Sequence, residues 1–398
     1  MNPTLSAPCD SKLGQPAAWG AVMAMSLAAF ALVASEFMPV SLLTPLGADL
    51  HITEGQAGQS IGISGAFALV TSLCLTSIVG RLDRKLLLMA LTLLMIASGT
   101  VAAFAPNYTL FMVGRALIGV AIGGFWSMSA ATVMRLVPSS DVPRALAILN
   151  GGNALATVIA APAGSYLGAV IGWRGAFFCL VPVAAIAMVW QLWSMPKLPV
   201  AHRAASGGML RLLRRPAVVL GMAACSLLFM GQFALFTYLR PFLESVTGVG
   251  VSTLSAMLLI LGVAGFVGTT LIGTLLKGRL YKVLVVMPLV MALVAIALVV
   301  FGHSTIAVTL LLAVWGLIGT SAPVGWWTWL AQTLPQDAEA GGGLMVAVVQ
   351  LAIMLGATLG GLLFDATGYR ATFYLSAGLL LAAAVVALLA GKAARRND

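Results

Sequence analysis

The sequence predicts an all-α membrane protein in which twelve transmembrane helices form two parallel six-helix repeats. Of its 398 residues, 61% are hydrophobic and 8% are charged, whereas soluble domains contain about 25% charged residues. Mean hydropathy is +1.06. Because one helical crossing needs about 20 apolar residues, this length suits about a dozen crossings joined by short loops. The strands of a membrane barrel would alternate polar and apolar residues over ~10 positions, and the sequence shows no such alternation.

The apolar stretches give the predicted spans in order. The first, at residues 18–43, follows a polar segment at 1–17. It is longer than the apolar core of a signal peptide, about 7–15 residues, so we interpret it as an uncleaved helix. An even number of spans places both termini on the same side of the membrane. The twelve predicted spans are residues 18–43, 57–79, 86–104, 108–133, 145–171, 176–193, 218–238, 252–275, 283–301, 306–330, 342–364 and 372–390.

The positive charges support this topology. The net charge is +10, which on its own would suggest an anionic partner such as nucleic acid. With twelve spans, however, 17 of the 21 Lys and Arg residues fall on one side, three fall on the other, and Arg115 lies inside a span. Positive residues mark the cytoplasmic side, so both termini are predicted to be cytoplasmic and nucleic acid is not expected. The four cysteines have no metal or redox spacing.

Three motifs recur along the chain at nearly constant offsets, which indicates an internal repeat. GRLDRK at 80–85 recurs as GRLYK at 278–282, an offset of 198 residues. ALIGVAIGGFW at 116–126 matches GLIGTSAPVGW at 316–326, an offset of 200. GWRGAFF at 172–178 matches GYRATFY at 368–374, an offset of 196. The matches relate equivalent spans in the same order, so the two halves are predicted to be parallel.

The repeat and the charge pattern together predict the domain organisation. A basic linker separates two apolar halves of similar length. The predicted units are a cytoplasmic tail at 1–17, a six-helix bundle at 18–194, a cytoplasmic linker at 195–217, a second six-helix bundle at 218–391 and a cytoplasmic tail at 392–398.

Several motifs then identify a family. Gly80, Asp83, Arg84 and Lys85 form a shortened version of a cytoplasmic signature, without its usual glycine and second basic cluster. The pattern from Arg115 through Gly119 to Gly123 and the AAPAG segment at 160–164 match motifs of spans 4 and 5, the latter in reduced form. In these features the chain resembles the major facilitator superfamily over essentially its whole length, which implies the major facilitator fold.

A narrower resemblance rests on five longer segments. These are SEFMPVSLLTPLGADL at 35–50, GGFWSMSAA at 123–131, GQFALFTYLRP at 231–241, PVGWWTWL at 323–330 and VAVVQLA at 346–352. Together they look like bacterial purine ribonucleoside efflux proteins, in the drug:proton antiporter branch of the superfamily. Sugar and arabinose exporters are near relatives within that branch. The resemblance implies export across the bacterial inner membrane in exchange for protons.

Two firmly ionised side chains lie within the predicted spans. Glu36 is in the outer half of span 1 and Arg115 is at a similar depth in span 4, so we expect them to be close. Burial disfavours an ionised carboxylate and a nearby cation favours it, a balance that suits a group that binds and releases protons. We predict Glu36 and Arg115 as the proton-coupling site. A structural carboxylate, with Arg115 bonded to span 1 carbonyl groups, is the alternative. Asp83, Arg84 and Lys85 are predicted to act in gating, as a charge lock between helices.

Cargo recognition requires a few polar groups in an aromatic-lined cavity. Side-chain amides inside spans can donate and accept together, which suits a purine edge or ribose hydroxyls. Aromatic rings supply flat surfaces for a base, although a ring taken singly is more often a packing residue or an interfacial anchor. The predicted substrate-binding residues are Trp126, Asn150, Asn153, Gln232, Phe236, Trp326 and Gln350.

The predicted function is therefore proton-coupled export of small neutral solutes by alternating access, with purine ribonucleosides such as inosine, adenosine and guanosine as cargo. A sugar, arabinose or multidrug exporter of the same fold is the alternative. The spans contain no clustered acid, base, nucleophile or metal ligands, so an enzyme is not predicted. We expect no cofactor other than the coupling proton. The expected partners are the small-molecule cargo, protons and the lipid bilayer, and the chain is expected to act as a monomer.

Overall fold

The computed structural model describes residues 17–78, 82–198, 209–334 and 337–394. Parts of the predicted organisation lie outside these residues: most of the tail at 1–17, Gly80 and Arg81 of the loop motif, residues 199–208 of the linker, and 395–398 of the second tail.

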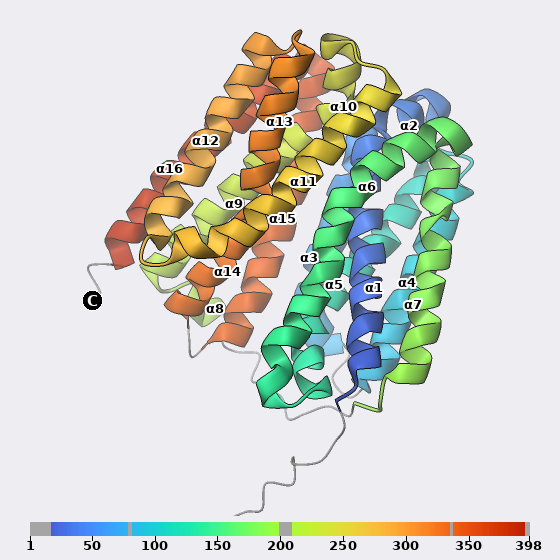
Figure 1. Ribbon diagram of the computed structural model, residues 1–398, viewed down its shortest axis with the longest axis vertical. Coiled ribbons are helices and arrows are strands. Elements are labelled where there is room, and N and C mark those ends of the chain that lie inside the picture. The colour runs from blue at the N-terminus through green and yellow to red at the C-terminus, as the bar shows by residue number, and fades with distance from the viewer. Residues whose placement is uncertain (1–16, 79–81, 199–208, 335–336, 395–398) are drawn as a thin grey trace, which may run out of the picture.

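The described elements are helices, arranged in two groups (Figure 1). The first half, residues 19–194, contains α1 (Trp19–Phe37), η1 (Met38–Ser41), α2 (Leu43–Leu50), α3 (Glu54–Ile78), α4 (Arg84–Ala103), α5 (Tyr108–Leu136), η2 (Ser139–Asp141), α6 (Val142–Phe178) and α7 (Leu180–Ser194). The short α8 (Met209–Leu212) follows. The second half, residues 216–394, contains α9 (Pro216–Phe236), α10 (Leu239–Phe242), η3 (Leu243–Thr247), α11 (Val251–Leu276), α12 (Leu280–Phe301), α13 (Thr305–Gly319), α14 (Ala322–Thr333), α15 (Ala338–Thr367) and α16 (Tyr369–Ala394).

The number of membrane crossings agrees with the prediction once a bent segment is considered. Among the described residues, 11 helical segments are long and apolar enough to cross a membrane. One of them, Val142–Ser194, has 53 residues, more than twice the ~20 that one crossing requires. It changes direction at Gly172, whose φ of +76° is favourable for glycine and costly for other residues. Counted as two crossings, this segment raises 11 to the predicted twelve, and the fold class is confirmed.

The predicted span at residues 306–330 is confirmed as one apolar segment, Thr305–Thr333, but two helices form it. α13 ends at Gly319 and α14 begins at Ala322. Pro323 explains the break, because proline has no N–H to donate and its ring clashes with the carbonyl group four residues earlier, which belongs to Gly319. The Ser321 hydroxyl in the gap donates to carbonyl groups of the preceding turn at 2.9 Å.

Contacts between the two halves involve few helices. α3 lies along α15, and α6 lies along α11. α2 and α10 lie near each other at one end of the molecule, named here the α2/α10 end, and α1 begins at the opposite end (Figure 1). The two halves therefore meet along two helix pairs, with short helices covering one end.

Charged and aromatic groups fix α2 within the first half. Arg174, near the kink of α6, forms an ion pair with Asp49 of α2, donates to the Ala105 carbonyl at 2.8 Å, and lies 4.2 Å from the Trp173 ring centroid. The ion pair, together with a hydrogen bond from Trp173, holds the pKa of the Asp49 carboxyl below its usual value. Arg174 thus joins α2, α6 and the loop after α4.

Candidate functional site

Close approach of α5 to α3 positions the central cation. The Asn107 side chain caps α5 by accepting from the Leu110 N–H at 2.9 Å. Farther along α5, Gly119 and Gly123 face α3 so closely that an added Cβ would lie 2.3 Å from the Ser64 carbonyl oxygen and 2.2 Å from that of Ala68. Small residues four apart allow such helix contacts in membranes. The glycine pattern seen in the sequence therefore brings α5 against α3 one turn away from Arg115.

Arg115 is buried, with 1% of its surface exposed, and joins three helices. Its guanidinium donates to the carbonyl oxygens of Ser35 at 2.7 Å, Glu36 at 3.2 Å and Ser60 at 3.1 Å, and to the Ser64 hydroxyl at 3.3 Å. A buried charge needs such compensation because isolated burial is very costly. These bonds to α1 carbonyl groups are those expected of a structural hub.

The Glu36 carboxylate lies where the two halves meet. Glu36 belongs to the last turn of α1, which ends at Phe37, and it is 5% exposed. Arg115 of the first half acts on its charge, and the Gln350 amide of α15 forms a side-chain hydrogen bond to it from the second half. Gln350, predicted as a cargo ligand, is thus placed beside the predicted proton site. The Oε1 atom of Gln350 is buried without a hydrogen-bond partner.

An aromatic group adjoins this carboxylate, and sequence reasoning missed two of its members. Phe37 of α1 stacks on Phe233 of α9 with ring centroids 5.8 Å apart, and meets the edge of Phe236 at 6.4 Å. Only Phe236 was predicted. Phe37 directly follows Glu36 in the sequence, but nothing in the sequence indicates that it faces the second half.

The other predicted cargo residues occupy different environments. Trp126 is half-buried and meets Phe125 of its own helix, and Trp326 is buried and meets Trp329 of its own helix, in each case with centroids 5.7 Å apart. Among the ring contacts of the described residues, these two tryptophans do not meet each other. The Trp326 indole nitrogen is buried without an acceptor.

The three remaining amides differ in exposure. Asn150 is exposed and donates to the Leu146 carbonyl of its own helix at 2.9 Å. Asn153 and Gln232 are half-buried. The Gln232 amide lies against Gly319, and its Oε1 atom is buried without a partner. Buried acceptors of this kind are normally satisfied by protein or water, so Gln232 and Gln350 offer acceptors to a donor that enters between the helices.

In the hydrogen bonds of the described residues, the predicted gating residues contact α4, α7 and the segment directly after α7. Asp83 caps α4 by accepting from the Lys85 N–H at 2.7 Å, and also accepts from the Leu198 N–H at 3.1 Å. The Arg84 N–H donates to the Leu198 carbonyl, and the Lys85 ammonium donates to the Met195 carbonyl at 2.7 Å. These bonds fasten α4 to the segment after α7. A role in gating stays a prediction.

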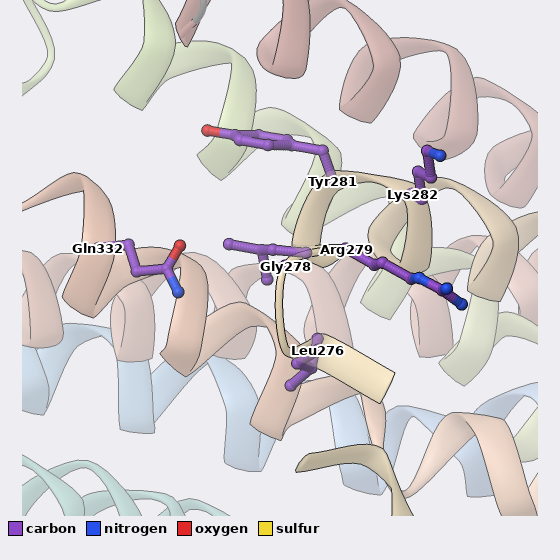
Figure 2. Close-up of a pocket in the computed structure, with 7 residues that line it drawn as sticks. Leu276, Gly278, Arg279, Tyr281, Lys282 and Gln332 are labelled. Carbon is purple, nitrogen blue, oxygen red and sulfur yellow. The ribbon is translucent and has the colours of Figure 1, made fainter. Parts of the chain in front are cut away.

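A cavity of about 360 Å³ lies elsewhere, at the turn between α11 and α12 (Figure 2). Figure 2 shows Arg279 and Lys282 on one side and Gln332 of α14 approaching from the other. None of the predicted site residues lines it. The cavity is therefore separate from the Glu36 site.

Comparison with known proteins identifies the family. The model of the Major Facilitator Superfamily matches residues 25–345. The chain is 60% identical over 382 residues to the "Transcription regulatory protein OpdE" of Pseudomonas aeruginosa, covering 95% of each chain. It is 41% identical over 368 residues to the "Purine ribonucleoside efflux pump NepI" of Salmonella paratyphi B, covering 92% of this chain and 93% of the relative.

Solved structures agree on the fold. A bacterial homolog of the human lysosomal transporter Spinster, in an inward-facing and unoccupied conformation, gives a TM-score of 0.77 at 14% identity, covering 96% of this chain and 98% of that one. A D-xylose-proton symporter gives 0.76 at 14% identity, with 94% and 97% covered. The match of the family model, the NepI relative and the shared architecture lead to one conclusion: the chain belongs to the major facilitator superfamily.

Proposed function

We propose that the protein exports purine ribonucleosides in exchange for protons, by alternating access. The observation that carries the proposal is the buried Glu36 carboxylate, which Arg115 contacts electrostatically from the first half and Gln350 hydrogen-bonds from the second. Binding or loss of a proton at Glu36 thereby changes a contact between the halves. The NepI relative, whose name describes purine ribonucleoside efflux, supports the cargo.

The mechanism follows from the hydrogen bond between Glu36 and Gln350. An ionised carboxylate accepts a charge-assisted hydrogen bond, roughly twice as strong as a neutral one. Protonation removes that assistance and weakens the link between α1 and α15. In the proposed cycle Glu36 accepts a proton from the periplasm, which favours release of cargo, and later loses it toward the cytoplasm. With both termini cytoplasmic, as the charge pattern predicts, the α2/α10 end faces the periplasm.

The proposed cargo site adjoins this carboxylate. The unpartnered oxygens of Gln232 and Gln350 would accept hydrogen bonds from the amino groups or hydroxyls of a nucleoside. The ring group of Phe37, Phe233 and Phe236 offers an apolar surface, and stacking of a base on an aromatic ring contributes about 1–3 kcal/mol.

Transport by the purified protein in proteoliposomes tests this proposal. Radiolabelled inosine should accumulate inside the vesicles when their lumen is made acidic, and adenosine or guanosine should compete with it. In Glu36→Gln, accumulation driven by the gradient should be lost while inosine exchange without a gradient persists, because the amide cannot titrate. Asp337→Asn is the control, since Asp337 pairs at 3.4 Å with Arg215, which directly precedes α9, and not with the first half. Full gradient-driven accumulation in Glu36→Gln would contradict the coupling role.

The same vesicle assay distinguishes the proposed function from two others. A sugar or drug exporter of this fold would move its own solute and not inosine. Transcriptional regulation is favoured by the name of the 60% identical relative. Against it, the longest predicted interval between spans, at 195–217, is much shorter than the roughly 55–65 residues of a small self-folding domain. A regulator would alter transcripts while showing no solute flux in vesicles.

A further inference from the structure

Near the α2/α10 end, the contact between α3 and α15 brings the two halves together with little side-chain bulk. Four glycines of α3, spaced three, four and three residues apart, face the second half. A Cβ added to them would lie 2.3 Å from Asp365, 2.1 Å from Tyr238, 2.9 Å from Thr358 and 3.0 Å from the Gln350 carbonyl oxygen, for Gly55, Gly58, Gly62 and Gly65 in turn. Residues at this spacing share one helix face. The halves are therefore in close contact along this line.

The N-terminus of α3 is capped from the other half. Thr53 and Gln56 form a capping box: the Thr53 hydroxyl accepts from the Gln56 N–H at 3.1 Å, and Gln56 Oε1 accepts from the Thr53 N–H at 2.9 Å. The same Thr53 hydroxyl donates to Asp365 Oδ2 at 2.6 Å, and the Gly55 N–H donates to Asp365 Oδ1 at 2.9 Å. Asp365 belongs to α15, 312 residues from Thr53. One carboxylate of the second half thus completes the cap of a first-half helix.

The position of Asp365 makes this contact specific to the closed arrangement, in which the two halves touch at the α2/α10 end. Asp365 lies in the last turn of α15 (Ala338–Thr367), where the dipole of its own helix disfavours a negative charge. The N-terminus of α3 offers the opposite end of a dipole and two hydrogen-bond donors. The carboxylate therefore gains its favourable environment from the other half and loses it when the halves separate here.

Other charges around the cap set its electrostatics. Glu54 of α3 lies within electrostatic reach of Asp365, Glu244 of η3 and Arg240 of α10. Arg240 forms an ion pair with Glu244 at 2.8 Å and donates to the Ser41 carbonyl of the first half. The negative charges of Asp365 and Glu244 repel that of Glu54, and the positive charge of Arg240 attracts it. The bond from Arg240 to Ser41 is a second polar link between the halves near the cap.

Tyr238 adds a packing contact to the same region. Its hydroxyl donates to the Ala357 carbonyl of α15 at 2.7 Å, and its ring stacks on Phe364 with centroids 5.2 Å apart. The aromatic group stands directly against Gly58.

We propose that Asp365 is a latch residue: its carboxylate caps α3 across the interface, and release of this cap is the step that allows the α2/α10 end to open. The latch depends on contact between the halves and not on the identity of the cargo. It thus goes beyond the proposed function and is tested without cargo or pH gradient.

The test measures the separation of the halves directly. Spin labels on Thr109→Cys, in the first turn of α5, and Thr305→Cys, in the first turn of α13, are placed on exposed positions in a chain whose native cysteines are replaced. Pulsed electron resonance then gives the distance distribution across this end. Asp365→Ala should raise the ratio of open to closed molecules roughly tenfold, equivalent to about 1.4 kcal/mol, and Asp365→Asn should give a smaller rise. Asp337→Asn, a control at the other end of α15, should give none.

Variants of the partner residue keep the proposal testable if Asp365→Ala folds poorly. Thr53→Val removes the hydroxyl donor and should open the same end, whereas Thr53→Ser should keep it closed. In the Asp365→Ala background Thr53→Val should add little, because the two changes remove one shared interaction. Unchanged distances in both Asp365→Ala and Thr53→Val, or equal opening in Thr53→Val and Thr53→Ser, would overturn the latch.

Discussion

Replacement of Gly119 by alanine tests whether helix contact positions the central cation. The added Cβ would lie 2.3 Å from the Ser64 carbonyl oxygen, whereas ordinary contact begins at 3.4 Å. The difference, 3.4 minus 2.3, requires α5 and α3 to separate by about 1 Å. The hydrogen bonds from Arg115 to Ser60 at 3.1 Å and to Ser64 at 3.3 Å would then stretch to about 4 Å, beyond hydrogen-bond range.

The expected magnitude combines two opposing effects. Overpacking costs about 1–3 kcal/mol, and alanine in place of glycine within a helix returns up to about 1 kcal/mol. A net loss of about 1–2 kcal/mol should lower the midpoint of thermal unfolding in detergent by roughly 2–8 °C, on the scale for mid-sized domains. The measurement is thermal unfolding followed by size-exclusion chromatography, together with gradient-driven transport, which should fall more than stability does.

Gly151→Ala is the matched control for this prediction. Gly151 lies in α6 and has nothing within 4 Å of the added Cβ, so only helix propensity acts and stability should stay constant or rise. If Gly119→Ala and Gly151→Ala unfold at the same temperature and transport equally well, the close α3–α5 contact does not hold Arg115 in place.

Three further predictions concern individual contacts. Arg115→Lys should lower the free energy of unfolding by about 1–3 kcal/mol in a denaturant titration, because one ammonium cannot reproduce the guanidinium bonds; an unchanged midpoint would contradict this. Phe37→Ala should weaken inosine binding more than Phe233→Leu, measured by tryptophan-fluorescence titration, since it removes the ring that meets both second-half phenylalanines; equal affinities would contradict the ring surface. The Asp49–Arg174 pair should stabilise the protein fully above the ordinary Asp pKa of 3.8 and lose this contribution as pH falls through the lower folded value. Because the two side chains are 37% and 47% exposed, the effect should stay below about 1 kcal/mol, and Asp49→Asn should match the wild type in unfolding midpoint only once the pH is below the lowered pKa of Asp49.

The fold was predictable because the membrane imposes length and charge rules on each segment. Apolar length located the crossings, and the positive residues predict one orientation for them. The break in the predicted span at 306–330 was missed because apolar length ignores the backbone, although Pro323 carried the signal.

The candidate site was predictable where a residue is unusual for its surroundings. Glu36 and Arg115 stand out as charges within apolar segments, and the structure places them near each other. Phe37 does not stand out, and the Asp365 cap joins residues 312 positions apart. Such contacts depend on how the halves dock, for which no local pattern exists.

The glycine face of α3 has a kinetic consequence for the transport cycle. Where large side chains interdigitate, they must leave their holes before two helices can roll past each other, and each withdrawal adds to the activation barrier. Gly55, Gly62 and Gly65 present no side chains to α15, and Gly58 presents none to Tyr238, so α3 has no side chains to withdraw on this surface. The rate of switching is then governed by the few polar contacts at its end, and turnover becomes adjustable through single residues without redesign of the interface.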